Sequence, residues 1–439
     1  MRKSDRAGGT GISRRWVVGA VLVTVGTMAL QGRAQVLPSL FPEGVPGYGT
    51  EAGVTVMSRN RAAWEPPGVR WGGFLLSPRL ETILGFNDNV LGGNPRRGSV
   101  VAAVRPSLLA TSTWSRHAFG AFVALDSARY PGAPAQSRTD GTVSVGGAVD
   151  IGRDRLTVGA AHVAAHQDRT QLDALPSDAP VAIRIDDLRL AYAATSGRWT
   201  WTPDLRVSRW RFGETTVLGE PVSQSYRDRD VLRGGVTVGY ELASLRSLVF
   251  VARTTSQHYP HISEGQARPD SLGYQVLAGL DYNDDALWRY RVLVGGESRR
   301  FTSAAFATQS AVITEAEVTW TPSGLTTVRA SLMRGLEDAA QAGVAGYIYS
   351  GARITVDHEY RRDLILNVAA GVQHAAFFGG SGHQWIYSVG LGATWLINRS
   401  LQLSATYGFS AVRSGGAVAS VLGSYDTRNL AMVTLRVGM

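Results

Sequence analysis

Apolar and polar residues alternate with a period of two along most of this chain. From Leu401 to Phe409 every second residue is apolar, and the residues between them are Gln, Ser, Thr and Gly. The segments Leu364–Val372 and Trp288–Val294 repeat the pattern. Strict alternation over this length is typical of β-strands with one apolar face. After the N-terminal segment there is no run of about 20 apolar residues, so no transmembrane helix is predicted.

The alternation divides the chain into about eighteen strand segments of about 10 to 14 residues each. With its turn, each segment takes up about 22 residues, and the even count suits an antiparallel closed sheet. The segments are expected to begin near Phe74, Val100, His117, Thr142, Arg155, Asp186, Arg198, Val231, Leu248, Tyr274, Trp288, Val312, Thr326, Gly351, Leu364, Trp385, Leu401 and Asn429.

Such strands could build a soluble sandwich or a transmembrane barrel, and three features favour the barrel. The polar side of the strands is rich in Gly, Ser, Thr and charged residues, which suits a water-filled lumen. Tight connections such as Gly152-Arg153 and Arg361-Arg362 alternate with long ones such as Gln167–Ile183. Aromatic residues collect at the strand ends, as in an interfacial girdle: Trp199, Trp201, Trp288, Trp320, Trp395, Tyr240 and Tyr282. We therefore expect an all-β, transmembrane, antiparallel up-and-down β-barrel.

The N-terminal segment 1–34 has the form of a cleavable signal peptide. A basic region is followed by the apolar stretch Trp16–Leu30 and by small residues around Ala34. Ser13-Arg14-Arg15 would also fit a twin-arginine signal. An ordinary basic region is the preferred interpretation, because outer-membrane cargo travels unfolded. We expect export through the periplasm to the outer membrane of a Gram-negative bacterium, a Pro-rich leader over 35–68 in the periplasm or the lumen, and a barrel over 69–439.

Charge and composition narrow the function classes. The chain has 44 basic and 35 acidic residues and no Cys, which excludes disulfides, thiolate metal sites and Cys nucleophiles. Lys3 is its only lysine, and no run of basic residues is longer than a pair. Without the signal segment, 38 basic residues face 34 acidic ones, a net charge of +4. We therefore expect no nucleic-acid partner.

The positions opposite the apolar face provide candidate pore-lining residues. An 18-stranded barrel is wide enough for an aqueous channel, and the planar donors of Arg suit carboxylates and sugar hydroxyls. Any single charge could simply pair across strands and solvate the wall. The candidates are Arg79, Glu81, Arg105, Arg189, Arg233, Arg253, Arg289, Arg291, Glu297, Glu315, Glu317, Arg329, Arg353, Asp357 and Arg436.

No constellation of catalytic or metal-binding residues is recognised. His162 and His166 share a strand face, but it is the lipid-side face, and no Asp or Glu is near them. There is no nucleophile elbow, and adjacent carboxylates such as Asp186-Asp187 point to opposite faces of a strand. We expect no catalytic residues, no metal, no cofactor and no enzymatic activity, with an outer-membrane hydrolase as a less favoured alternative.

A family resemblance adds a second line of inference. Gly72–Pro78 followed by Gly85–Val90 resembles the opening of the β-barrel porins encoded in capsule and exopolysaccharide loci, of the "putative beta-barrel porin 2" type. Thr319–Pro322 and Val356–Glu359 agree with it, and the similarity extends over about residues 69–439. One departure is the last strand, which ends on Met439 where outer-membrane barrels commonly end on an aromatic residue.

The resemblance implies an outer-membrane channel through which a secreted polysaccharide leaves the cell. Its expected partners are the lipid bilayer, the secreted polysaccharide, a periplasmic polysaccharide-export protein and the barrel-assembly machinery. A general or sugar-selective diffusion porin for small solutes is the alternative, with the same architecture and a different cargo.

Overall fold

The chain forms a closed barrel of eighteen antiparallel strands. The computed structural model describes residues 44–48, 55–93, 95–263, 265–283, 287–380, 382–423 and 425–439. The predicted signal peptide therefore lies outside the described residues. The first seven wall strands are β2 (Phe74–Asn87), β3 (Ser99–Ser112), β4 (Ala118–Arg129), β5 (Arg138–Ile151), β6 (Asp154–Gln167), β7 (Val181–Ser196) and β8 (Trp199–Phe212).

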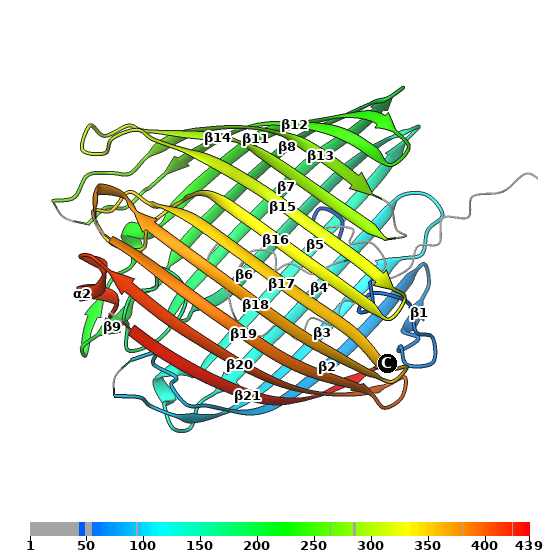
Figure 1. Ribbon diagram of the computed structural model, residues 1–439, viewed down its shortest axis with the longest axis horizontal. Helices are drawn as coiled ribbons and strands as arrows, with labels where there is room; N and C mark the ends of the chain where they lie inside the picture. Colours follow the sequence, from blue (N-terminus) through cyan, green and yellow to red (C-terminus); the bar gives the residue numbers. More distant parts are fainter. Residues whose placement is uncertain are drawn as a thin grey trace, which may run out of the picture.

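Eleven further strands complete the wall. They are β11 (Arg229–Ala243), β12 (Arg246–His258), β13 (Ser271–Asn283), β14 (Trp288–Phe301), β15 (Gln309–Ser323), β16 (Thr326–Glu337), β17 (Tyr347–Arg361), β18 (Leu364–Phe377), β19 (Gly382–Leu396), β20 (Leu401–Gly415) and β21 (Tyr425–Gly438). Every strand pairs with its neighbour in the chain, and β2 pairs with β21 to close the ring, with Thr82 opposite Leu435. Figure 1 shows the closed wall, with β2 in blue beside β21 in red. The predicted fold class is confirmed.

Smaller elements lie outside the ring. The short strand β1 (Val69–Trp71) pairs with the start of β2, and β9 (Thr215–Val217) and β10 (Glu220–Val222) form a hairpin between β8 and β11. The connections also contain the 3-10 turns η1 (Pro134–Gln136), η2 (Ser225–Arg227) and η3 (Phe378–Gly380) and the helix α2 (Val418–Leu422). Among the described residues no helix has the length and hydrophobicity needed to cross a membrane.

The alternation in sequence becomes an outer and an inner face of the wall. In β2, Leu84 is 62% exposed while its neighbour Ile83 is 3% exposed. Successive side chains of a strand point to opposite faces. The exposed apolar side chains thus form one continuous outer surface, the inverse of a soluble sandwich and the arrangement that a lipid environment requires.

Aromatic side chains gather on this outer surface at the end of the barrel with the short connections. Trp288 stacks on Trp320 with ring centroids 5.3 Å apart, and Trp199 lies 4.7 Å from the ring of Tyr240. The indole N–H of Trp395 donates to the carboxylate of Asp363 in the neighbouring turn. These rings have one apolar and one polar end, which suits the boundary between hydrocarbon and headgroups.

The two ends of the barrel differ in their connections. At one end, the turn end, strands are joined by a few residues, for example Gly152-Arg153 between β5 and β6. At the other, the loop end, connections such as 168–180 and 338–346 are much longer. By the general rule for such barrels, the turn end faces the periplasm.

Strand starts differ from the predictions in a systematic way. Strands that follow short turns begin within two residues of the predicted positions, whereas those that follow long loops begin one to five residues earlier. At the loop end the backbone ladder continues beyond the apolar belt. There, side chains such as those of Arg138–Gly141 in β5 are polar on both faces, so no alternation marks the start.

The turn after β2 also secures the seam of the barrel. The amide of Asn89 donates to the carboxylate of Asp426 at 2.7 Å, and the Asp88 carboxylate accepts from the backbone N–H of Asn429 at 2.6 Å. Asp426 and Asn429 both belong to β21. The Asn-Asp-Asn motif therefore closes its own turn and also ties the first wall strand to the last.

Candidate functional site

The inner face of the wall carries the charged residues that the alternation placed there. All fifteen predicted pore-lining residues lie in wall strands, at positions alternating with the exposed apolar ones. In β14, for example, Arg289 and Arg291 alternate with the outward-facing Trp288, which is 42% exposed. A solute that passes through the lumen would therefore meet these charges.

Many of these charges pair across the wall. Arg105 lies 2.8 Å from Asp126, Arg329 lies 3.0 Å from Asp357, and Arg436 is bonded to Glu81. Arg253 donates both terminal nitrogens to the Glu315 carboxylate, at 2.5 and 3.3 Å. Partly exposed pairs of this kind add little stability. These pairs give the lumen a hydrated wall that carries both positive and negative charges.

Two clusters are more deeply buried. Asp187, whose side chain is fully covered, accepts from Arg189 at 2.7 Å and from Arg206 at 2.5 Å. Arg299 lies between Asp338 at 2.8 Å and Glu297 at 3.5 Å. Arg299 and Asp338 are absent from the predicted set. Arg299 has the same strand parity as Glu297, so the alternation rule could have found it, whereas Asp338 lies in a loop to which that rule does not apply.

A short piece of the leader lies against the inner wall. We call Gly44–Tyr48 the lumenal arm. Its Val45 and Tyr48 side chains are 1% and 7% exposed and pack against Val163 of β6 and Ile185 of β7. The Tyr48 hydroxyl donates to the backbone carbonyl of Asp187 at 3.0 Å, and the Arg189 guanidinium stacks over the Tyr48 ring at 4.4 Å.

Three glycines make room for the lumenal arm. Gly120, Gly146 and Gly159 lie opposite one another on β4, β5 and β6, forming what we call the glycine row. A Cβ at Gly146 would lie 2.0 Å from the carbonyl oxygen of Pro46, and one at Gly120 would lie 2.7 Å from that of Gly44. No other residue type permits so close an approach of two backbones.

A second piece of the leader, the mouth segment (Thr55–Gly68), contacts the far side of the barrel at the turn end. Val56 packs with Ile365 of β18, and its N–H donates to the Thr327 hydroxyl of β16 at 2.9 Å. Arg61 donates to the Glu359 carboxylate of β17 at 2.8 Å. Burial lowers the pKa of Arg61 to about 10, so the side chain keeps its charge at neutral pH.

The lumenal arm and the mouth segment contact opposing walls of the barrel. In the ring of eighteen strands, β4–β7 and β16–β19 are separated by six strands on one side and by four on the other, so they form opposing walls. The sequence allowed a leader in the periplasm or in the lumen. The lumenal arm lies within the lumen, and the mouth segment lies at its turn end (Figure 1).

At the loop end, loop 168–180 reaches from one wall of the lumen to the opposing wall. It leaves β6, yet Leu172 is fully buried among Tyr347, Phe377 and other residues of β17–β19. The N–H of Asp173 donates to Gln384 of β19 at 2.8 Å, and its carboxylate accepts from the N–H of Ala340 at 2.5 Å. Chain segments therefore lie inside the channel toward both of its ends.

The structure gives each histidine of the pair a carboxylate neighbour. His162 and His166 do lie near carboxylates, contrary to the expectation: His162 contacts Asp186 at 2.7 Å and His166 contacts Asp140 at 2.6 Å. The carboxylates come from neighbouring strands, which strand pairing brings close and sequence distance conceals. Each histidine has a separate carboxylate, and the described residues contain no group of three potential ligands around one point.

The chain is distantly similar to several proteins of known structure. Solved structures similar to this chain include OccK2 (OpdF) of Pseudomonas aeruginosa in complex with glucuronate, at 14% identity, covering 83% of this chain and 98% of that one, with a TM-score of 0.45. OccAB4 of Acinetobacter baumannii is 8% identical over 83% and 97% of the two chains, with a TM-score of 0.45. The FrpB iron transporter of Neisseria meningitidis is 11% identical over 77% of this chain, with a TM-score of 0.44. The alignment covers 63% of FrpB, less than two thirds of its length. No curated protein matches the chain.

The polar lumen inside an apolar outer wall defines a β-barrel channel of the bacterial outer membrane. The model of the family described as "Putative beta-barrel porin 2" matches residues 61–438, and the chain belongs to that family. The match takes in the whole barrel and much of the mouth segment.

Proposed function

We propose that this channel is the exit through which a capsular polysaccharide or exopolysaccharide leaves the cell. The observation that carries the proposal is the lumen itself, a wide polar passage that holds segments of the chain toward both of its ends. The similarity of Gly72–Pro78 and Gly85–Val90 to porins of polysaccharide loci supports the same cargo.

The presence of the lumenal arm and loop 168–180 inside the channel favours a polymer over small solutes as the cargo. A diffusion porin works as an open sieve, and any segment across its lumen reduces the flux. A polymer channel as wide as eighteen strands would leak small molecules whenever it held no polymer. The lumenal arm and loop 168–180 would limit that leak and move aside when a chain enters.

The wall charges would keep the polymer hydrated during passage. Arg presents planar donors that match carboxylates and vicinal hydroxyls, and the nearby carboxylates prevent the wall from holding an anionic chain too tightly. In this proposal the fifteen pore-lining residues act together as a polar surface, with no catalytic step and no cofactor.

The proposed partners follow from the location. A periplasmic polysaccharide-export protein would deliver the polymer at the turn end, beside the mouth segment. The barrel-assembly machinery would insert the strands into the bilayer.

Deleting the gene and quantifying polysaccharide on the cell surface and in the periplasm tests the proposal. We expect surface polymer to be lost, periplasmic polymer to accumulate, and the plasmid-borne gene to reverse both. Unchanged surface polymer together with slower uptake of small sugars would contradict the proposal and favour a diffusion porin.

A further inference from the structure

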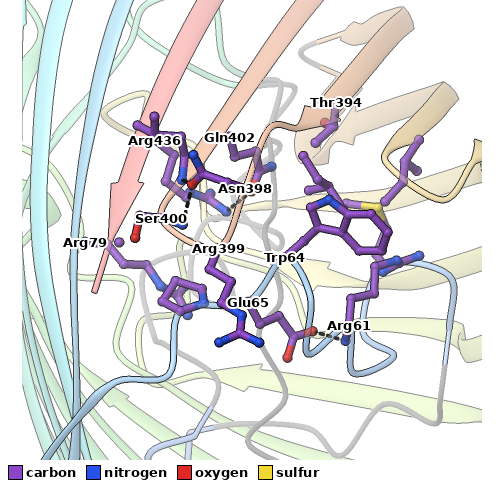
Figure 2. Close-up of a pocket in the computed structure, with 16 residues that line it drawn as sticks. Arg61, Trp64, Glu65, Arg79, Thr394, Asn398, Arg399, Ser400, Gln402 and Arg436 are labelled. Carbon is purple, nitrogen blue, oxygen red and sulfur yellow. Dashed lines mark hydrogen bonds between the residues drawn. The ribbon is translucent and has the colours of Figure 1, made fainter.

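A pocket opens at the turn end, between the mouth segment and the ends of β18–β21. Figure 2 shows it enclosed by the mouth segment on one side and by the turn Asn398–Ser400 on the other. Its atom-free space is about 620 Å³, part of which is open to solvent. The pocket lies where a polymer arriving from the periplasm would first meet the channel.

The lining of the pocket is strongly cationic. It includes four arginines, at positions 61, 79, 399 and 436, and one carboxylate, Glu65. Arg61 is bonded to Glu359, and Arg436 to Glu81 and Gln402. The Glu65 carboxylate accepts from the backbone N–H of Arg61 at 2.7 Å, which fixes the fold of the mouth segment.

Two of the four arginines remain available to a ligand. Neither Arg79 nor Arg399 forms a hydrogen bond or an ion pair with any residue that the structure describes. Both line the pocket on the side away from Trp64 (Figure 2). An arginine fork without a partner, at the edge of a pocket, is suited to a carboxylate, which it can bind through two parallel hydrogen bonds.

The opposite side of the pocket is apolar and aromatic. Trp64 packs against the cluster of Val56, Ile365 and Leu396 and presents a half-buried ring to the pocket. Thr394, Ser400 and Gln402 supply hydroxyl and amide groups between the two sides. A sugar ring has a matching division, with C–H groups on one face and hydroxyls at its edge.

We propose that this pocket binds a carboxylate-bearing sugar unit, with the carboxylate at Arg79 or Arg399 and one ring face against Trp64. The inference rests on the proposed function and narrows it, because it makes the exported polymer an acidic, uronate-containing one. The pocket then holds the leading sugar units at the entrance while the lumenal arm still lies inside the lumen.

Isothermal titration of the purified full-length protein in detergent tests the pocket. The probes are trigalacturonate, the neutral maltotriose and inorganic phosphate. Trigalacturonate should bind more tightly than either of the others. The double variant R79S/R399S should lose about tenfold or more of that affinity, the usual effect of removing charge-assisted hydrogen bonds.

The matched control is R70S/R362S, which removes two exposed arginines that do not line the pocket and should bind like the wild type. Unchanged affinity in R79S/R399S would overturn the proposal. So would equal binding of maltotriose, which would indicate a neutral-sugar site, or of phosphate, which would indicate a general anion site. If the double variant does not fold, R399S alone carries the test, because Arg399 lies in an exposed turn.

The experiments can refute the acidic-sugar pocket and the export function independently of each other. Trigalacturonate binding together with unchanged surface polymer after gene deletion would refute export and leave the pocket standing. Loss of surface polymer on deletion, with no preference for trigalacturonate over maltotriose, would refute the acidic-sugar site and leave export standing.

Discussion

The lumenal arm and loop 168–180 both lie inside the channel, but the wall holds them by different means. The arm fits against the glycine row, where the absence of side chains lets its backbone come close. The loop is held by polar contacts of Asp173, whose buried carboxylate accepts from the N–H of Ala340 and whose backbone N–H donates to Gln384. The arm should therefore respond to added volume in the wall, and the loop to the loss of polar atoms.

The largest effect on conductance should come from Gly146→Val. The new side chain would occupy the position of the Pro46 carbonyl, 2.0 Å from its Cβ, and displace the arm. In planar bilayers the single-channel conductance should rise several-fold. The matched control is Gly147→Val, which adds the same side chain to the outer face of the same strand, with its nearest contact at 3.7 Å. Equal conductance of the two variants and the wild type would show that the arm does not limit the channel.

Asp173→Ala tests how the wall holds loop 168–180. It leaves the buried N–H of Ala340 without its acceptor, which should weaken the seating of the loop by about 1–3 kcal/mol. Protease added to whole cells should cut loop 168–180 faster, with a smaller rise in conductance than for Gly146→Val because the arm stays in place. Asp186→Ala removes an exposed carboxylate and should leave cleavage unchanged. Equal cleavage of both variants would mean that Asp173 does not secure the loop.

Glu359→Gln asks whether the mouth segment is held by charge. The variant removes the shared acceptor of Arg59 and Arg61, so backbone amides of Val56–Arg61 should exchange hydrogen faster. Conductance should change less than for the two variants above, because Val56 and Trp64 remain packed on Ile365. Glu317→Gln is the control, since Glu317 faces the lumen and forms no ion pair with the described residues. Unchanged hydrogen-exchange rates would mean that apolar packing alone holds the mouth segment against the barrel.

Replacing all three of Arg253, Arg289 and Arg291 by Ser should change the charge of the wall and leave the lumenal arm and loop 168–180 in place. The variant leaves Asp281 and Glu315 without their ion-pair partners, so the lumen becomes more negative. The reversal potential in a KCl gradient should shift toward cation selectivity at nearly unchanged conductance, and export of polymer should fall. The triple Lys variant keeps the charge and should stay close to the wild type. If selectivity and export both stay the same, these arginines have no part in passage.

Period-two alternation was sufficient to predict the barrel and its strands. It worked best at the turn end, where apolar residues run up to the turn, as in Leu364 after Arg361-Arg362. It worked less well at the loop end, because the ladder there extends through polar residues such as Tyr425–Arg428 in β21.

The positions of the lumenal arm and of loop 168–180 inside the barrel could not be predicted in the same way. Gly120, Gly146 and Gly159 become a row only through the register of three strands, and nothing local in the sequence sets that register. Asp173 finds its partners more than 160 residues away in sequence. The carboxylates beside His162 and His166 were missed for the same reason, since they belong to other strands.

The most direct test of the account is release of polymer from vesicles that contain the purified channel. Vesicles are loaded with a uronate-containing polysaccharide and, separately, with a small neutral sugar, and efflux is compared for the wild type, Gly146→Val and Gly147→Val. We predict that all three release polymer and that Gly146→Val releases it fastest. Retention of the polymer by every variant, while the small sugar escapes from each, would contradict a polymer channel and identify a small-solute porin.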